Sequence, residues 1–295
     1  MFESVDAVAE GLRAQGYLTG RDVATQVYLA SRLGKPLLVE GPPGSGRSAL
    51  ARSVAAAGGV PFFEVACSPQ ITADDATHRW DVDRQLLHLR EAAAAGRNME
   101  HPRAEAFSET FLIPGPVISA FRESGPSVLL FRDIALAPAP FLLWLGRVLD
   151  DSAVDVPALG RISAPVRPVV FLTANADRPI SPEIAHRCLA ISLSYPPFEA
   201  EVEILLRHVK GLSRPLAAQV TNFLGRLRQQ PLTIAPGLSE SLDWSRALVA
   251  LRAGGLSPQL VDQTLGCILK DARDLDTFRG RKLGSLLGGA MDRLG

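Results

Sequence analysis

The feature that most constrains the fold is a glycine-rich segment, GPPGSGRS, at residues 41–48. A short apolar run, Leu37–Val39, precedes it, and an alanine-rich stretch of helix formers, Ser48–Ala57, follows it. The segment fits G-x-x-x-x-G-[K/R]-[S/T] between a strand and a helix, a pattern typical of loops that wrap phosphates. Glycines let backbone N–H groups converge on phosphate oxygens, and the following helix adds the positive end of its dipole. The sequence therefore predicts a phosphate-binding loop, with an ordinary glycine-rich turn as the alternative.

Every position of this loop is a candidate for nucleotide binding: Gly41, Pro42, Pro43, Gly44, Ser45, Gly46, Arg47 and Ser48. We expect the Ser48 hydroxyl to ligate a magnesium ion that the nucleotide carries. Arg47 stands where such loops usually have lysine. Because arginine keeps the positive charge, we expect ATP or ADP binding to survive. Because its planar guanidinium is bulkier than an ammonium, alignment with the reacting phosphate is expected to suffer.

The second half of such a site is a carboxylate for magnesium and another acid for the attacking water, both at a strand tip. The candidate strand is Val128–Ile134, where four apolar residues are followed by Arg132 and Asp133 instead of two acids. In one register Arg132 takes the metal-binding position. In the other, Asp133 holds the metal and Ile134 falls at the base position.

Neither register supplies a complete pair of acids, so Asp133 is a catalytic candidate and Arg132 a nucleotide-binding one. A cation close to the metal would be repelled by it, although it would also offset phosphate charge directly. Whether magnesium binds is left open by Arg132. The alternative interpretation is that Arg132 faces solvent or an internal acid.

Alternating strand and helix patterns occupy the chain up to about residue 195. Besides those at the loop, strands are expected at 60–67, 127–134, 168–173 and 189–193, a hairpin at 154–162, and helices at 2–14, 20–33, 83–95 and 140–149. Residues 68–106 are otherwise polar and irregular. This alternation predicts an α/β fold with a mainly parallel sheet covered on both faces.

Beyond Pro196 and Pro197 the strand patterns stop. Residues 199–229, 239–254 and 257–273 all have helical patterns. We therefore expect two domains, an α/β nucleotide-binding domain at 1–195 and a smaller all-helical domain at 196–295.

Composition narrows the choice of partner and compartment. The chain has 295 residues, and its 31 basic and 31 acidic side chains cancel, so no overall basic field favours nucleic acid or an anionic membrane. Its three cysteines are widely spaced, which is typical of reduced thiols in a cytoplasmic protein. Residues 1–30 have no signal-peptide pattern, and no apolar run is long enough to cross a membrane.

Several further segments give the chain a specific resemblance. They are Tyr28–Ala30, Gly34–Gly41, Gln85–Arg90, Val148–Asp150, Val154–Gly160, Phe171–Asn175, Arg187–Leu189 and Leu242–Leu248. Together with the loop, they make residues 15–275 resemble MoxR-type AAA+ ATPases, closest to the branch associated with maturation of carbon monoxide dehydrogenase and other molybdenum hydroxylases. The resemblance implies an αβα sandwich, a helical lid, and a homo- or hetero-oligomeric ring, usually a hexamer. It also implies a partner with a von Willebrand factor A domain and a client enzyme.

The resemblance assigns roles to three more residues. Asn175 matches the polar sensor of the γ-phosphate, and Arg246 matches the arginine of the lid that contacts this phosphate. Arg187 matches the arginine that reaches a neighbouring subunit's site; the family often has two arginines here, and His186 takes the first place. The alternatives are that Asn175 caps a turn and that Arg187 is a surface cation. Gln85–Arg90 and Phe111–Pro116 lie where the family carries an inserted helix and hairpin facing substrate or partner.

The sequence thus predicts a chaperone-like remodelling or assembly factor that binds ATP or ADP, with hydrolysis weakened or lost through Arg47 and Arg132. Two alternatives stay open: an active ATPase motor for metalloenzyme maturation, and a nucleotide-free scaffold subunit. A small-molecule kinase is least favoured, because the lid and Arg187 suit a ring ATPase.

Overall fold

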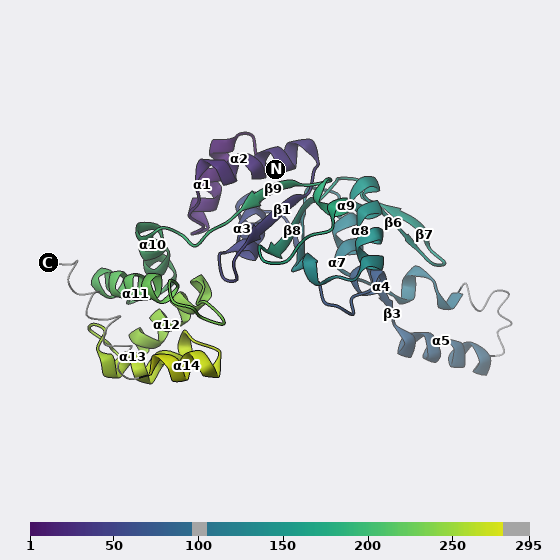
Figure 1. Ribbon diagram of the computed structural model, residues 1–295. Helices are drawn as coiled ribbons and strands as arrows, with labels where there is room; N and C mark the ends of the chain where they lie inside the picture. The colour runs from purple at the N-terminus through teal and green to yellow at the C-terminus, as the bar shows by residue number, and fades with distance from the viewer. Residues whose placement is uncertain (96–104, 280–295) are drawn as a thin grey trace. The chain divides into compact units, whose positions relative to one another are not determined.

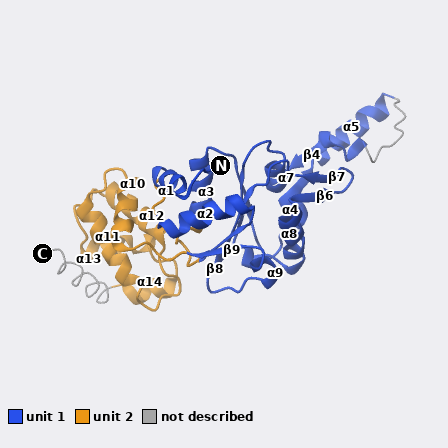
Figure 2. Cartoon of the chain, turned by 90° about the horizontal axis from the view of Figure 1, so that it is seen from above, with its two compact units in different colours: residues 1–15, 19–40, 48–192 blue, residues 16–18, 41–47, 193–295 orange. Residues whose placement is uncertain are grey.

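The computed structural model describes residues 1–95 and 105–279, which fall into two compact units (Figure 2). Unit 1 comprises residues 1–15, 19–40 and 48–192, and unit 2 comprises residues 16–18, 41–47 and 193–295. The glycine-rich loop thus clusters with the C-terminal helices. The domain boundary expected at 195 stays a prediction.

A five-stranded sheet forms the centre of unit 1, in the order β2-β5-β8-β1-β9. Its strands β8, β1 and β9 are labelled in Figure 1. The strands are Leu37–Gly41 (β1), Phe62–Ala66 (β2), Val128–Arg132 (β5), Val169–Asn175 (β8) and Leu189–Ser192 (β9). The pairs β1–β9, β2–β5 and β5–β8 are parallel. Continuous apolar runs such as Val128–Phe131 are fully buried, as expected for strands covered on both faces. The predicted α/β class with a mainly parallel sheet is confirmed.

Helices flank this sheet. They are Val5–Ala14 (α1), Arg21–Leu33 (α2), Arg47–Gly58 (α3), Pro116–Phe121 (α7), Ala139–Asp151 (α8) and Pro182–Ala185 (α9). Local chemistry sets their ends: the Ser4 hydroxyl accepts from the Ala7 N–H at the start of α1, and Gly34 ends α2 in the left-handed conformation. The apolar sides of α7 and α8 join the strands in one buried cluster that includes Phe131 and Phe141.

Between β2 and β5 the chain forms a small insertion that the sequence analysis described only in part. Ala73–Thr77 (α4) leads into His78–Trp80 (β3), which pairs antiparallel with Leu112–Pro114 (β4). The expected helix is present as Val82–Ala94 (α5), at one end of unit 1 (Figures 1 and 2). The predicted irregular region 68–106 therefore also holds α4 and β3, while its residues 96–104 lie outside the described part of the chain.

The expected hairpin is also present, as the antiparallel strands Ala153–Val156 (β6) and Gly160–Ser163 (β7). Short 3₁₀ turns at Glu109–Phe111 (η1) and Ile134–Leu136 (η2) complete unit 1.

Unit 2 is helical apart from its two short N-terminal segments. Its helices are Phe198–His208 (α10), Arg214–Leu227 (α11), Leu238–Ala250 (α12), Pro258–Thr264 (α13) and Ala272–Phe278 (α14), with a 3₁₀ turn at Leu265–Cys267 (η3). They bury one apolar cluster around Trp244 and Phe223. The segment 199–229, expected to be helical throughout, is broken before α11, where the Ser213 hydroxyl caps a new helix with proline in its first turn. Residues 280–295 of the predicted lid lie outside the described residues.

Within the described ranges, no helix combines the length and the apolar character that crossing a membrane requires.

Candidate functional site

The glycine-rich loop connects β1 to α3, and its shape depends on glycine at two positions. Gly44 and Gly46 have φ angles of 73° and 92°, in the left-handed region that glycine adopts without strain. A Cβ atom on Gly44 would lie 2.5 Å from the Cα of Gly237. Within the loop, the Ser45 N–H donates to the Pro42 carbonyl at 3.2 Å. The backbone can therefore take the curled form of a phosphate cradle because side chains are absent at these points.

Residues distant in sequence contact this loop within unit 2. The Tyr195 hydroxyl donates to the Pro43 carbonyl at 3.1 Å, and the Leu238 N–H donates to the Gly44 carbonyl at 2.9 Å. The Tyr17 ring lies where a Cβ on Gly46 would meet it at 3.5 Å. Burial raises the pKa of both tyrosines above the ordinary value, so their hydroxyls stay protonated well above neutral pH. No local pattern in the sequence predicts these contacts, because only folding brings the three segments together.

Polar groups of the loop itself are placed for a ligand. Ser45 is buried, and its hydroxyl has no hydrogen-bond partner within residues 1–95 and 105–279. Arg47 is the first residue of α3, so Ser48 lies in the first turn of this helix. The positive end of the α3 dipole adds to the charge of Arg47. A buried hydroxyl beside such a helix start suits an oxyanion.

At the carboxyl end of β5, Arg132 does not stand alone. Its Nε lies 3.3 Å from Oε1 of Glu64 on β2, and Glu64 also accepts from Arg52 at 2.5 Å. This geometry matches the alternative in which Arg132 faces an acid, here one in the neighbouring strand. Glu64 was missed by the sequence analysis, since only the β2–β5 pairing brings it near Arg132.

Asp133 follows immediately, but it leaves the line of the strand. Its φ angle is 58°, in the left-handed region, and its N–H donates to the Thr173 hydroxyl at 3.0 Å. Aspartate tolerates this conformation better than most residues. Burial raises the pKa of the nearby Cys67 thiol to about 12, and the Asp133 charge adds to this shift. An acid is therefore present after β5, but on a turned backbone.

Asn175 is the last residue of β8, the strand between β5 and β1. Its amide oxygen is buried, and in the part of the chain that the structure describes it finds no hydrogen-bond partner. Buried polar atoms in native proteins are nearly always paired with protein or water. The Asn175 oxygen is therefore suited to a ligand or an ordered water, in keeping with its expected sensor role, which stays a prediction.

Arg187, the expected intersubunit arginine, is held within its own subunit. Its Nε and NH2 donate to the two carboxylate oxygens of Asp150 at the end of α8, at 2.9 and 2.8 Å. It also donates to the Glu183 carbonyl. The hydrogen bonds from Arg187 lower the pKa of Asp150, and the same pairing raises the pKa of Arg187. Its role towards a neighbour stays a prediction.

This pairing makes a testable prediction about Asp150. Replacing its partner, Arg187→Gln, is expected to raise the Asp150 pKa towards its ordinary value, because the main group stabilising the carboxylate is removed. Because the pKa of Asp150 is lowered in the folded protein, the pair stabilises the fold at pH values above the ordinary carboxyl pKa. This stabilisation is lost as the pH falls through the lowered pKa of the folded state. A carbon-13 NMR titration of the Asp150 carboxyl measures the change.

Arg161→Gln is the matched control, because it removes the adjacent exposed pair with Asp151. It is expected to leave the Asp150 titration unchanged. An unchanged Asp150 pKa in Arg187→Gln would contradict the assigned cause.

The last candidate, Arg246, lies on α12 with its side chain largely exposed, and its NH1 donates to Asp243 at 2.8 Å. No cluster of three or more His, Cys, Asp or Glu side chains able to hold a metal occurs among the described residues.

A comparison with known families matches residues 36–188 to the AAA domain, dynein-related subfamily. The chain belongs to this family. The matched span covers slightly more than half of this AAA chain, from β1 to the residue before β9. It contains every candidate site residue except Arg246.

Solved structures similar to this AAA protein include RuvB from Thermotoga maritima. One single-residue variant of RuvB has 15% sequence identity and a TM-score of 0.46, with 90% of this chain and 70% of that chain covered. The structure described as the RuvB Holliday junction branch migration motor has 15% identity and a TM-score of 0.44 over the same shares. No curated protein matched the chain.

Proposed function

We propose that this AAA protein binds ATP or ADP and acts as a chaperone-like remodelling or assembly factor whose own hydrolysis is weak or absent. The observation that carries the proposal is a contrast between two motifs of the chain, each described within its own unit. The phosphate loop keeps its glycine-dependent backbone, whereas the end of β5 presents Arg132, paired with Glu64, and an Asp133 on a left-handed backbone.

Nucleotide binding is supported by what the loop offers. The bare backbone at Gly44 and Gly46, the first turn of α3 and the buried Ser45 hydroxyl suit phosphate oxygens. Arg47 supplies the positive charge, and Ser48 has the hydroxyl that would help to hold magnesium. The residues present therefore fit a nucleotide phosphate chain.

Weak hydrolysis follows from the missing acids. Phosphoryl transfer depends almost wholly on positioning and charge stabilisation, with an acid for the metal and another group to orient water. Asp133 is the single acid at this strand end, and the next residue, Ile134, has no polar group. Glu64 is engaged by two arginines. We infer that magnesium is held less firmly than in an active ATPase and that water is poorly oriented.

The finer assignment to the MoxR branch is part of the proposal. Family members commonly form rings, and we propose a homo- or hetero-oligomeric ring, with hexamers as the family's usual form. Helix α5 exposes Val82, Leu86 and Leu87, which suits contact with a client or with a von Willebrand factor A domain partner. All three cysteines are free thiols, in keeping with the cytoplasmic location that we propose.

An active motor is the second candidate. It is favoured by the Asn175 oxygen, which has no hydrogen-bond partner among the described residues, and by the presence of Arg187, because we expect both residues to match groups of the hydrolytic machinery of a ring ATPase. Because a subunit that lacks a complete pair of acids can still assist turnover in a neighbour, these two groups are also compatible with the binding subunit. Hydrolysis by the pure protein at a rate ordinary for the family would favour the motor over the binding subunit.

Nucleotide binding can be tested at Gly44. The Gly44→Ala variant is expected to weaken binding of a fluorescent ATP analogue at least tenfold, because the new Cβ collides with the backbone of Gly237 and strains a left-handed φ. Fluorescence anisotropy, with and without magnesium, measures the dissociation constant.

Gly59→Ala is the matched control. Gly59 has a similar φ of 61°, but a Cβ there would have no neighbour within 4 Å. We expect its affinity for the analogue to match that of the unaltered protein. Absence of ATP and ADP binding by the unaltered protein would overturn the proposal and favour the scaffold interpretation.

A further inference from the structure

The phosphate loop is held at two consecutive peptide units by other segments of unit 2. The Tyr195 hydroxyl, from the segment between β9 and α10, donates to the Pro43 carbonyl at 3.1 Å. At the next peptide unit the Leu238 N–H, at the start of α12, donates to the Gly44 carbonyl at 2.9 Å. Two segments far from the loop in sequence therefore fix adjacent carbonyls of the loop.

A contact between two glycines brings the start of α12 against the loop. Gly237 immediately precedes α12, and a Cβ atom on it would lie 2.5 Å from the Gly44 Cα and 2.8 Å from the Pro43 oxygen. The φ angle of Gly237 is −90°, which any residue adopts, so it is the contact that requires glycine here. The backbone of α12 can approach this closely because neither glycine carries a side chain.

The two hydrogen bonds orient N–H groups of the loop as well as its carbonyls. In a planar trans peptide unit, the C=O of one residue and the N–H of the next point in opposite directions. Holding the Pro43 carbonyl therefore turns the Gly44 N–H away from Tyr195. Holding the Gly44 carbonyl likewise orients the Ser45 N–H, which closes the turn to Pro42 at 3.2 Å. Oriented backbone N–H groups are what gives such a loop its affinity for anions.

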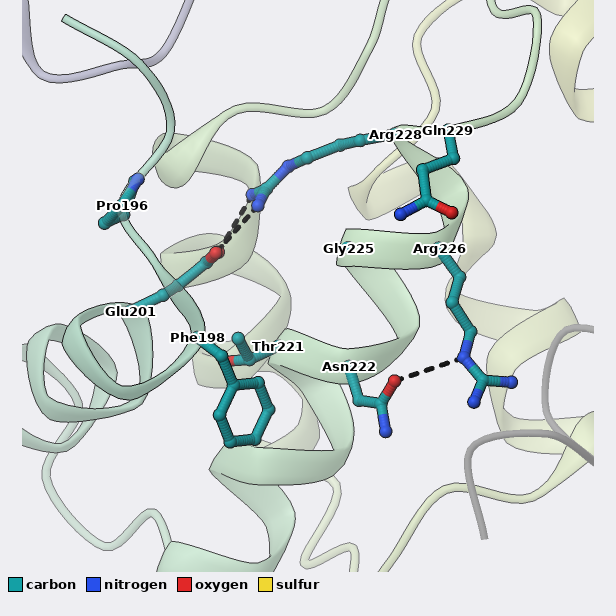
Figure 3. A pocket seen from close by; sticks show the side chains of 9 residues that line it. All are labelled: Pro196, Phe198, Glu201, Thr221, Asn222, Gly225, Arg226, Arg228 and Gln229. Carbon is teal, nitrogen blue, oxygen red and sulfur yellow. Dashed lines mark hydrogen bonds and ion pairs between the residues drawn. The ribbon is translucent and has the colours of Figure 1, made fainter. Parts of the chain in front are cut away.

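One guanidinium positions both of these contacts. Arg228 lies 4.5 Å from the centre of the Tyr195 ring. Its Nε donates at 2.8 Å to the carbonyl of Pro236, the residue before Gly237. Both carboxylate oxygens of Glu201 accept from the same guanidinium, at 2.7 and 2.8 Å (Figure 3). Because this ion pair is buried, it sets the position of the tyrosine together with that of the chain entering α12.

A glycine-rich loop benefits most from such support. Glycine loses more backbone freedom on ordering than any other residue, so a loop that closed only around phosphate would lose that entropy on binding. A ligand binds more tightly when the fold has already ordered its site. The contacts from Tyr195 and α12 therefore favour nucleotide binding without touching the nucleotide.

We propose that Tyr195 and the start of α12, at Gly237 and Leu238, are positioning elements of the nucleotide site, which hold the phosphate loop in its binding form before ATP or ADP arrives. Arg228 acts through both of them. This inference rests on the proposed nucleotide binding and names the residues outside the loop that control its strength. Displacing α12 from the loop then lowers the affinity for nucleotide.

Tyr195→Phe tests the first contact, because it removes the hydroxyl and keeps the ring beside Arg228. We expect the full chain to bind ADP and ATP about three- to tenfold more weakly, since one hydrogen bond no longer supports the loop. Isothermal titration calorimetry measures both dissociation constants. Tyr28→Phe is the matched control, because it removes a tyrosine hydroxyl that donates to the Glu3 carbonyl in unit 1. Its affinities should equal those of the unaltered protein.

Gly237→Ala tests the second contact from outside the loop. The added Cβ would overlap backbone atoms of Pro43 and Gly44, so α12 and the loop must separate, and we expect both nucleotides to bind at least tenfold more weakly. Gly254→Ala is the matched control in the same unit. Gly254 also has a φ angle outside the left-handed region, and its Cβ would have no neighbour within 4 Å among the described residues. We expect this control to bind both nucleotides normally.

A readout in the nucleotide-free protein separates positioning from a loss of stability. In Tyr195→Phe, the carbon-13 signal of the Pro43 carbonyl and the amide signal of Gly44 are expected to shift, because this peptide unit has lost its hydrogen bond. A general loss of stability would leave both signals of the folded protein in place. Urea unfolding establishes that each variant is folded under the binding conditions.

Binding by the unaltered protein distinguishes failure of this inference from failure of the proposed function. If the unaltered protein binds neither ADP nor ATP, the proposed function fails and the inference fails with it. If the unaltered protein binds nucleotide and either Tyr195→Phe or Gly237→Ala binds it equally well, the inference alone is overturned. Unchanged Pro43 and Gly44 signals in Tyr195→Phe would overturn it as well.

Discussion

Replacing three residues together, Arg47→Lys, Arg132→Asp and Asp133→Glu, is expected to raise the rate of ATP hydrolysis about a hundredfold or more. The change restores a compact ammonium at the outer phosphates, an acid for magnesium and a longer acid for the attacking water. Preorganised charged groups of this kind are each worth about 10²–10³ in rate in other enzymes. Release of inorganic phosphate under saturating magnesium and ATP measures the effect.

The structure adds a condition to this experiment. Arg132 is paired with Glu64, so an aspartate at position 132 would place a second carboxylate near Glu64 in exchange for its partner. Like charges raise each other's pKa and repel. The same triple variant should therefore be made with Glu64→Gln as well, and we expect this fourfold variant to be the faster one.

Arg122→Asp serves as the control, because it also removes an arginine paired with a glutamate, Glu109, outside the candidate site. Its hydrolysis rate should equal that of the unaltered protein. The proposal fails if the unaltered protein already hydrolyses ATP at a rate typical of the family. It fails equally if the triple and fourfold variants bind ATP and hydrolyse no faster.

The Arg228→Met variant is expected to lower the free energy of unfolding of unit 2 by about 3–5 kcal/mol, because it leaves a buried carboxylate without its partner. The side chains of Arg228 and Glu201 are 9% and 2% exposed. Arg228 also donates to the Pro236 carbonyl at 2.8 Å and lies 4.5 Å from the centre of the Tyr195 ring. Several elements of the unit therefore depend on one guanidinium.

Urea unfolding measures this effect through the fluorescence of Trp244, which is fully buried in the core of unit 2. Trp80 and Trp144 are first replaced by phenylalanine so that the signal reports on this unit. Arg214→Gln is the matched control, since its pair with Glu203 lies in the same unit but is exposed. We expect it to change the free energy of unfolding by less than about 1 kcal/mol.

The double variant Arg228→Met with Glu201→Leu separates charge from packing. Because it removes both charges, it should recover much of the lost stability. If Arg228→Met proves no more harmful than Arg214→Gln, the buried pair does not stabilise the unit as argued.

Local patterns were sufficient for most of the fold. Buried strands such as Val128–Phe131 are continuous apolar runs, and the loop at 41–48 is recognisable because glycine alone adopts its backbone. The break at Ser213 before α11 was missed, although serine followed two residues later by proline is a local start signal. There the helical periodicity on both sides outweighed the capping signal in the prediction.

The amino-acid sequence by itself determined the kind of chain this is: an α/β sheet, a phosphate loop with arginine for lysine, and a strand end short of one acid. These features depend on neighbours within a few residues. Only the tertiary structure decided which charges meet, as in Arg132 with Glu64 and Arg187 with Asp150, and which groups reach the loop, as Tyr195 does. The reason is physical: an ion pair between distant residues forms where strands and helices place two side chains within about 4 Å, and no local spacing encodes that distance.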